Sequence, residues 1–166
     1  MFDRKKVMEE FDQEMARTRR MLKGVPADRM DWSPHEKSWT LGELATHLAQ
    51  LPGWTAPTLQ AGELDLEAMD REALAPPSPG PKGLLDLFDR LVGEARKAVE
   101  SVSVDAMDDP WTLRTGEAEI FTLPRWNVFR MTVLNHIIHH RAQLGVYLRL
   151  LDLPIPQVYG STADNP

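Results

Sequence analysis

Residues 135–149 read NHIIHHRAQLGVYLR, a stretch that places two histidines four residues apart. At about 100° per residue in an α-helix, His136 and His140 project side by side, about one turn apart. Apolar residues define the inward stripe of the same helix: Val133, Ile137, Leu144, Leu148 and Leu151. On a helical wheel His140 and His136 lie on or beside this stripe, whereas His139 lies on its flank. Two imidazoles that share one helix face can bind a single ion.

A third histidine is predicted on the inward face of an earlier helix. The run Thr40-Leu41-Gly42-Glu43 fits a capping box, in which the threonine and glutamate side chains satisfy each other's backbone donors. The apolar face that follows consists of Leu41, Leu44, Leu48 and Leu51. His47 lies beside Leu44 and Leu48, so we expect it to face the helix that carries His136 and His140. Pro52-Gly53 should kink or interrupt this helix, which can continue over residues 54–60.

Together the three histidines predict one divalent metal ion held by His47, His136 and His140. Three neutral nitrogen ligands with an open position are the set that catalytic zinc uses to acidify a bound water. Imidazole also suits nickel, copper and iron, so the spacing does not fix the element. The alternative is that each histidine is a packed, hydrogen-bonded core residue. Burying three imidazoles without a shared purpose is costly unless each finds a partner, and this favours metal.

Several neighbours are weaker candidates for the same site. Asn135, His139 and Gln143 can orient the imidazoles as supporting partners, or they are simply polar flank residues. Glu43 lies one turn before His47 and can accept a proton, although its capping role already explains it. Tyr159 can approach the cavity from the C-terminal tail, or it packs there. The sequence assigns no catalytic residue, general acid or general base.

The rest of the chain predicts a single helical domain over residues 1–166. Residues 2–23 lack glycine and proline and carry apolar residues at steps of three and four, and Gly24 and Pro26 end this helix. A third helix is expected over residues 83–101. The last helix should have Pro124 in its first turn and extend to about Leu151. Four helices joined partly by long connections indicate an all-α four-helix bundle.

Three other segments are not expected to belong to the bundle helices. Residues 111–122 form two short runs around Thr115-Gly116, which predicts a small β-hairpin before the last helix. The connection over residues 62–81 is long for a compact domain, so we expect part of it to fold or to form a lid. The tail over residues 153–160 contains two prolines and should pack across the bundle.

Composition and charge exclude several classes of function. The net charge of −6 argues against a protein that tracks nucleic-acid phosphates. The chain has no cysteine, so any metal must be bound by nitrogen and oxygen ligands. The N-terminus lacks the apolar segment of a signal peptide, and no stretch has the length of apolar residues that a membrane span needs. We therefore expect a cytoplasmic protein that has neither a nucleic-acid partner nor a membrane partner.

Three motifs resemble those of the DinB-like (DinB/YfiT) superfamily. Residues 38–48 (SWTLGELATHL) resemble its second-helix motif, and residues 135–149 resemble its last-helix motif. Residues 154–164 (PIPQVYGSTAD) resemble the tail that follows. The order and spacing of these motifs cover essentially the whole chain. One departure is Ala142, where glycine is common in the family, and this position is not a ligand.

This resemblance implies an up-down-down-up four-helix bundle with a three-histidine metal site, often zinc or nickel. Carried over residue by residue, the implied ligands are His47, His136 and His140. Similar proteins are often homodimers, and some are thiol-dependent transferases or isomerases that use bacillithiol, mycothiol or glutathione. Because this chain has no cysteine, such a thiol must come from a low-molecular-weight cosubstrate.

Three functions are consistent with these expectations. The leading one is a metal-dependent enzyme of thiol S-transferase type that acts on a small electrophilic substrate. The alternatives are a metal-dependent hydrolase and a non-catalytic metal-binding structural or stress protein.

Overall fold

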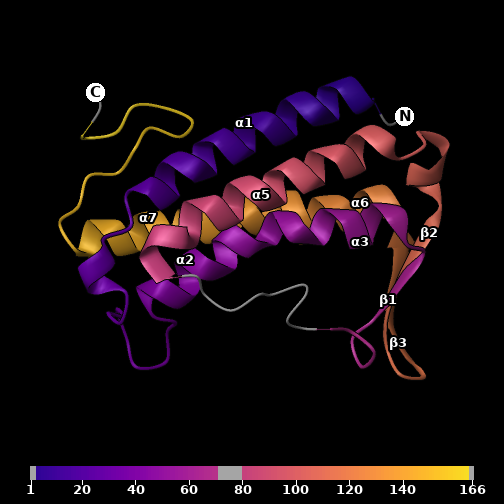
Figure 1. Cartoon of the computed structure of the whole chain (residues 1–166), viewed down its shortest axis with the longest axis horizontal. Coiled ribbons are helices and arrows are strands. Elements are labelled where there is room, and N and C mark those ends of the chain that lie inside the picture. Colours follow the sequence, from indigo (N-terminus) through magenta and orange to yellow (C-terminus); the bar gives the residue numbers. More distant parts are fainter. Residues whose placement is uncertain (1–2, 71–79, 165–166) are drawn as a thin grey trace.

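Four long helices lie side by side in the computed structural model, which describes residues 3–70 and 80–164 (Figure 1). They are α1 (Arg4–Lys23), α2 (Leu41–Gln50), α5 (Gly80–Ser101) and α7 (His136–Leu150). Helix α1 contacts α5 and α7, and α2 contacts the same two helices. In Figure 1, α1 and α7 run away from the end that carries the strands, whereas α2 and α5 run towards it.

The first two long helices begin at side-chain caps. Asp3 caps α1 by accepting hydrogen bonds from the backbone N–H groups of Lys5 and Lys6, and Gly24 follows its last residue. Thr40 caps α2, and both halves of its capping box with Glu43 are present. The predicted capping box is therefore confirmed. It satisfies backbone donors that the first turn of a helix otherwise leaves unpaired.

Proline and glycine interrupt the second helix, as predicted. After α2 the chain forms a 3₁₀ turn over Leu51–Trp54 and then a short helix, α3 (Thr55–Gln60). Two other 3₁₀ turns, Ala27–Arg29 and Asp105–Asp108, lie in the connections before α2 and after α5.

A small sheet at one end of the bundle shows that the fold is not purely helical. Strands β2 (Pro110–Thr115) and β3 (Ala118–Pro124) form the predicted hairpin, with Gly116 at a φ of 54° in its turn. Strand β1 (Glu63–Asp65) adds a parallel pairing to β2, so the fold is mostly helical, as predicted, with a three-stranded sheet in place of the hairpin alone. Part of the 62–81 connection is thereby folded. The remainder of that connection, over residues 71–79, lies outside the described residues.

The last helical stretch has three parts, where the sequence predicts one uniform helix. Pro124 precedes α6 (Arg125–Phe129), and a π-helical segment over Arg130–Asn135 separates α6 from α7. In a π-helix hydrogen bonds join residues five apart, so side-chain directions differ from those of a regular α-helix. The segment ends directly before His136, which begins the regular helix α7.

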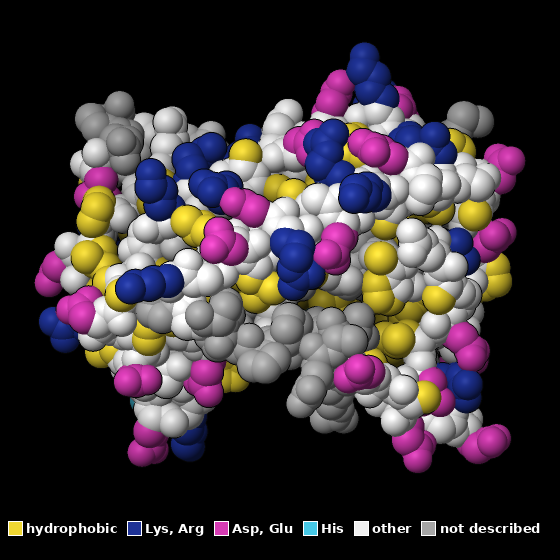
Figure 2. Space-filling view, in the orientation of Figure 1, with side chains coloured by type: hydrophobic (Ala, Val, Ile, Leu, Met, Phe, Trp, Pro, Cys, Tyr) yellow, Lys and Arg dark blue, Asp and Glu magenta, His cyan; other side chains and the backbone are white. Residues whose placement is uncertain are grey.

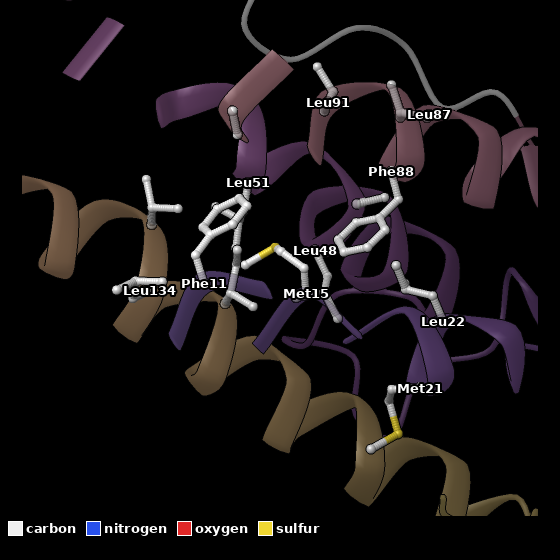
Figure 3. Close-up of a cluster of buried hydrophobic side chains, with 14 of the residues drawn as sticks. Phe11, Met15, Met21, Leu22, Leu48, Leu51, Leu87, Phe88, Leu91 and Leu134 are labelled. Atoms are coloured by element: carbon white, nitrogen blue, oxygen red, sulfur yellow. The ribbon is translucent and has the colours of Figure 1, made fainter. Parts of the chain in front are cut away.

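The core fills the space between the four long helices and contains the predicted apolar stripes. Phe11 and Met15 from α1 meet Leu48 from α2 and Phe88 from α5 (Figure 3). Val133, Ile137, Leu144 and Leu148 are fully buried, as the helical wheel predicts. The tail packs through Leu153, Ile155 and Val158 against this core, so its predicted contact with the bundle is confirmed.

The outer face over α1 and α5 carries basic and acidic side chains side by side (Figure 2). Ion pairs between Arg19 and Asp89 and between Arg96 and Asp12 join the two helices. In the part of the chain that the structure describes, no helix is both long and apolar enough to cross a lipid bilayer.

Truncation of Leu22 tests the position of this core. Leu22 is 2% exposed, whereas Leu150 is 57% exposed. We expect Leu22→Ala to lower the free energy of unfolding by about 2–5 kcal/mol, because it leaves a cavity, and Leu150→Ala to change it by less than about 0.5 kcal/mol. Urea unfolding followed by circular dichroism measures both. Equal effects of the two substitutions would contradict this assignment of the core.

Candidate metal centre

The structure brings the three predicted ligands together from two helices. His47 lies on α2, and His136 and His140 lie one turn apart on α7. One ring nitrogen of each histidine lies within 4.8 Å of the other two. The Nε2 atoms of His47 and His136 are 3.4 Å apart. His140 is buried and the other two are partly buried, so the nitrogens converge at the edge of the core.

This spacing fits a bound divalent cation. Zinc–nitrogen bonds of 2.0–2.1 Å in tetrahedral geometry place two nitrogen ligands about 3.3 Å apart. A direct hydrogen bond between His47 and His136 also fits their separation, but it joins only two of the rings. The convergence of a third nitrogen, from His140, favours a shared ion. Their role as ligands remains a prediction.

Hydrogen bonds behind two of the imidazoles fix their orientation. The Nδ1 atom of His140 lies 2.7 Å from Oε1 of Gln143, an acceptor that favours the proton on Nδ1 and leaves Nε2 free. His136 forms a hydrogen bond with the backbone of Thr132. Metal-binding histidines commonly use such partners to set their tautomer and ring direction. Gln143 therefore has the position of a supporting partner that orients the His140 ring.

Burial keeps the three imidazoles neutral. Desolvation lowers the pKa of His47 from 6.5 to about 4, with smaller contributions from the neighbouring His140 and His136. Desolvation is also the main cause that lowers the pKa of His136 and of His140, and the hydrogen bonds of these two rings partly oppose it. A neutral imidazole has a free lone pair that can bind a cation, whereas a protonated imidazole has none and repels the cation. The three rings therefore have the protonation state that metal binding requires at neutral pH.

Trp39 forms a wall of the centre that the sequence analysis did not identify. Its indole stacks on the His140 ring at 5.5 Å between centroids and meets the His47 ring edge-on at 5.0 Å. Its carbonyl oxygen accepts a hydrogen bond from the hydroxyl of Tyr147. Trp39 is nevertheless 47% exposed. The signal available in the sequence was its place directly before the Thr40 cap, about two helical turns before His47.

Two cavities share Trp39 as a common wall. One, of about 300 Å³, is lined by His47 with Gly42, Glu43, Thr46 and Gln50. The other, of about 320 Å³, is lined by His140 with Lys37, Ser38, Leu44, Gln143 and Tyr147. Each is at the lower end of the size range of small-molecule sites. A larger apolar groove of about 480 Å³ lies on the opposite face of α7, where none of the three histidines lines it.

The remaining candidates have different surroundings. Asn135 and His139 are exposed. The His139 ring lies 4.8 Å from the His140 ring, but His139 does not belong to the group of three histidines whose nitrogens converge. Glu43 accepts hydrogen bonds from Thr40 as the capping partner, and it also lines the cavity beside His47. The hydroxyl of Tyr159 bonds to Glu14 and Arg141, behind α7, where it is separated from the metal centre.

Comparison with solved structures finds the same fold in several bacterial proteins. A DinB-like protein from Bacillus cereus is 22% identical, with a TM-score of 0.67 and coverage of 92% of this chain and 95% of that one. A DinB-like protein from Bacillus subtilis is 16% identical, with a TM-score of 0.69 and coverage of 93% and 99%. A mycothiol-dependent maleylpyruvate isomerase is 15% identical, with a TM-score of 0.57 and coverage of 99% of this chain but 65% of that one.

A search of curated proteins finds no match. The model of the DinB superfamily matches residues 10–144, which is most of the chain and includes all three histidines of the candidate centre. The resemblance of the sequence motifs is thereby confirmed, and the chain belongs to the DinB superfamily.

Proposed function

We propose that the protein is a divalent-metal-dependent enzyme of thiol S-transferase type that acts on a small electrophilic substrate. The observation that carries the proposal is the convergence of His47, His136 and His140 beside two cavities large enough for small molecules. Zinc and nickel are the proposed metals, because the family resemblance implies them and imidazole nitrogen suits both.

The chemistry of the donor set supports a catalytic use. A divalent ion bound by three imidazoles lowers the pKa of a thiol that occupies a remaining position, so that the thiol reacts as a nucleophile at neutral pH. The chain itself contributes three neutral imidazoles, the Gln143 contact that orients His140, and the Trp39 indole that stacks on His140. Since the chain has no cysteine, the thiol is a second small molecule.

Two further expectations belong to this proposal. We propose that the four long helices have the up-down-down-up topology, which the chain directions in Figure 1 support. We also propose that the protein is a homodimer, as the family resemblance implies, and that it acts in the cytoplasm. The mycothiol-dependent isomerase with the same fold supports the thiol as cosubstrate, although that activity is a property of the neighbour.

Metal content tests the three-histidine site directly. Protein purified without a histidine tag and repleted with Zn²⁺ or Ni²⁺ should bind one equivalent, measured by elemental analysis after gel filtration. His140→Ala should weaken binding by more than the ten- to hundredfold that loss of a supporting hydrogen bond typically causes. His139→Ala is the matched control, because this exposed neighbour is outside the set. Equal metal in the two variants would rule out the proposed ligand set.

The pH dependence of stability tests whether the ligands are neutral. Unfolding restores the ordinary pKa of 6.5 to His47, so the unfolded chain binds this proton at a higher pH than the folded protein, whose His47 has a pKa of about 4. The free energy of unfolding of the metal-free protein should therefore be fully retained above pH 6.5 and decrease as the pH falls towards 4. His47→Gln should reduce the decrease. Urea unfolding at each pH measures the free energy of unfolding of both proteins. Parallel pH curves for wild type and His47→Gln would contradict a neutral, buried His47.

Thiol dependence of turnover separates the transferase from a hydrolase. We expect the zinc- or nickel-loaded protein to accelerate the conjugation of chlorodinitrobenzene with bacillithiol, mycothiol or glutathione, followed by absorbance, and His140→Ala to abolish the acceleration. The same loaded protein should not hydrolyse nitrophenyl acetate in the absence of thiol. Metal-dependent ester hydrolysis without thiol, together with no conjugation, would contradict the transferase proposal and favour the hydrolase.

A further inference from the structure

A buried polar cluster lies behind α7, at the same level as the metal centre. The side chain of Arg141 is 2% exposed and forms an ion pair of 2.6 Å with Glu14 of α1, whose side chain is 6% exposed. Arg141 directly follows the ligand His140, and one residue along a helix corresponds to a rotation of about 100°. His140 therefore faces α2 and Arg141 faces α1 from one turn of the same helix.

The guanidinium of Arg141 makes four hydrogen bonds in this cluster. Its Nη1 atom donates to the backbone oxygen of Glu14 at 3.1 Å and to Oγ1 of Thr18 at 3.2 Å. Its Nη2 atom donates to Oε2 of Glu14 at 2.6 Å and to the hydroxyl of Tyr159 at 2.7 Å. The rigid guanidinium accommodates these partners in only one orientation. We call Arg141, Glu14, Thr18 and Tyr159 the arginine cluster.

Apolar burial alone does not select one rotation of α7. Leu144 and Leu148 are fully buried, but Val146 and Leu150 on the other side of the helix are 58% and 57% exposed. A helix with apolar residues on both sides gains apolar contact in more than one orientation.

We propose that Arg141 is a positioning residue, which through the arginine cluster fixes the rotation of α7 and hence the direction of His136 and His140 towards His47. This inference rests on the proposed function of the histidines as ligands. Tyr159 also belongs to the arginine cluster, and this position was not predicted from the sequence. Its hydroxyl donates to Glu14 at 2.7 Å and accepts from Arg141, so the C-terminal tail closes the cluster.

The energetics of buried ion pairs support positioning over stabilisation. Removing two charges from water costs free energy that their attraction seldom recovers in full, so an apolar pair of similar volume is often as stable or more stable. A buried pair that contributes little stability can still select one arrangement among several apolar ones, as a single buried asparagine does in a coiled coil.

The double variant Glu14→Leu/Arg141→Met tests the inference, because it removes both charges of the buried ion pair. Arg17, which also pairs with Glu14, keeps the backbone oxygen of Val158 as a partner. We expect its urea midpoint without metal to be unchanged or higher. Its dissociation constant for Co²⁺, used as the probe metal, should rise on the order of tenfold, with an altered d–d absorption spectrum. Tyr159→Phe should change both in the same direction by less. Arg19→Met/Asp89→Leu is the matched control, because it removes an ion pair of α1 that lies outside the cluster.

A readout without metal separates this inference from the proposed function. In the metal-free wild type we expect cross-relaxation between ring protons of His47 and His136, and ring-current shifts of His140 caused by Trp39. The double variant should lose or weaken both. If wild type bound no Co²⁺, the proposed function would fail while these spectra still tested the rotation of α7. Unchanged ring signals, or an unchanged Co²⁺ affinity and spectrum in the double variant, would overturn the positioning role.

Discussion

The convergence of three neutral imidazoles from two helices is the constraint on which the rest of the structure depends. Each ring is at least partly buried, and burial, with smaller contributions from His140 and His136, lowers the pKa of His47 to about 4. A polar ring withdrawn from water costs free energy unless it finds a partner. Gln143 and the backbone of Thr132 partner His140 and His136 on their outer sides. Among the nitrogens that converge, those of His47 and His136 are 3.4 Å apart, and we propose that a shared cation binds all three rings.

The surrounding elements hold the two ligand helices at fixed positions. The capping box of Thr40 and Glu43 begins α2 about two turns before His47. Leu44 and Leu48 bury that helix against the core. The π-helical segment ends directly before His136, the first proposed ligand on α7. Such segments frequently occur at functional sites. Trp39 then covers one side of the centre and divides the space beside it into two cavities.

Much of this arrangement could be predicted from the sequence because its signals are local. The spacing of His136 and His140, the capping box at Thr40 and the turn at Gly116 each depend on residues within one or two turns of chain. The pairing of β1 with β2 could not be predicted, since it joins residues about fifty positions apart through backbone bonds that carry no side-chain signature. For Tyr159 the sequence leaves open an approach to the metal cavity or packing of the tail, and its contact with Arg141 depends on how the tail crosses α1. The π-helical segment was likewise not predicted, because the helical wheel assumes regular α-helical spacing. Val133 within it is nevertheless buried, as the wheel predicts.

X-ray absorption at the metal edge tests the central claim most directly. For Zn²⁺- or Ni²⁺-loaded wild type, the account predicts nitrogen ligands at about 2.0–2.1 Å with outer-shell scattering from three imidazoles. His47→Ala should reduce that scattering to two imidazoles, since the two ligands of α7 remain. A metal coordinated by one imidazole or none in the wild type, or a spectrum that His47→Ala leaves unchanged, would contradict the account.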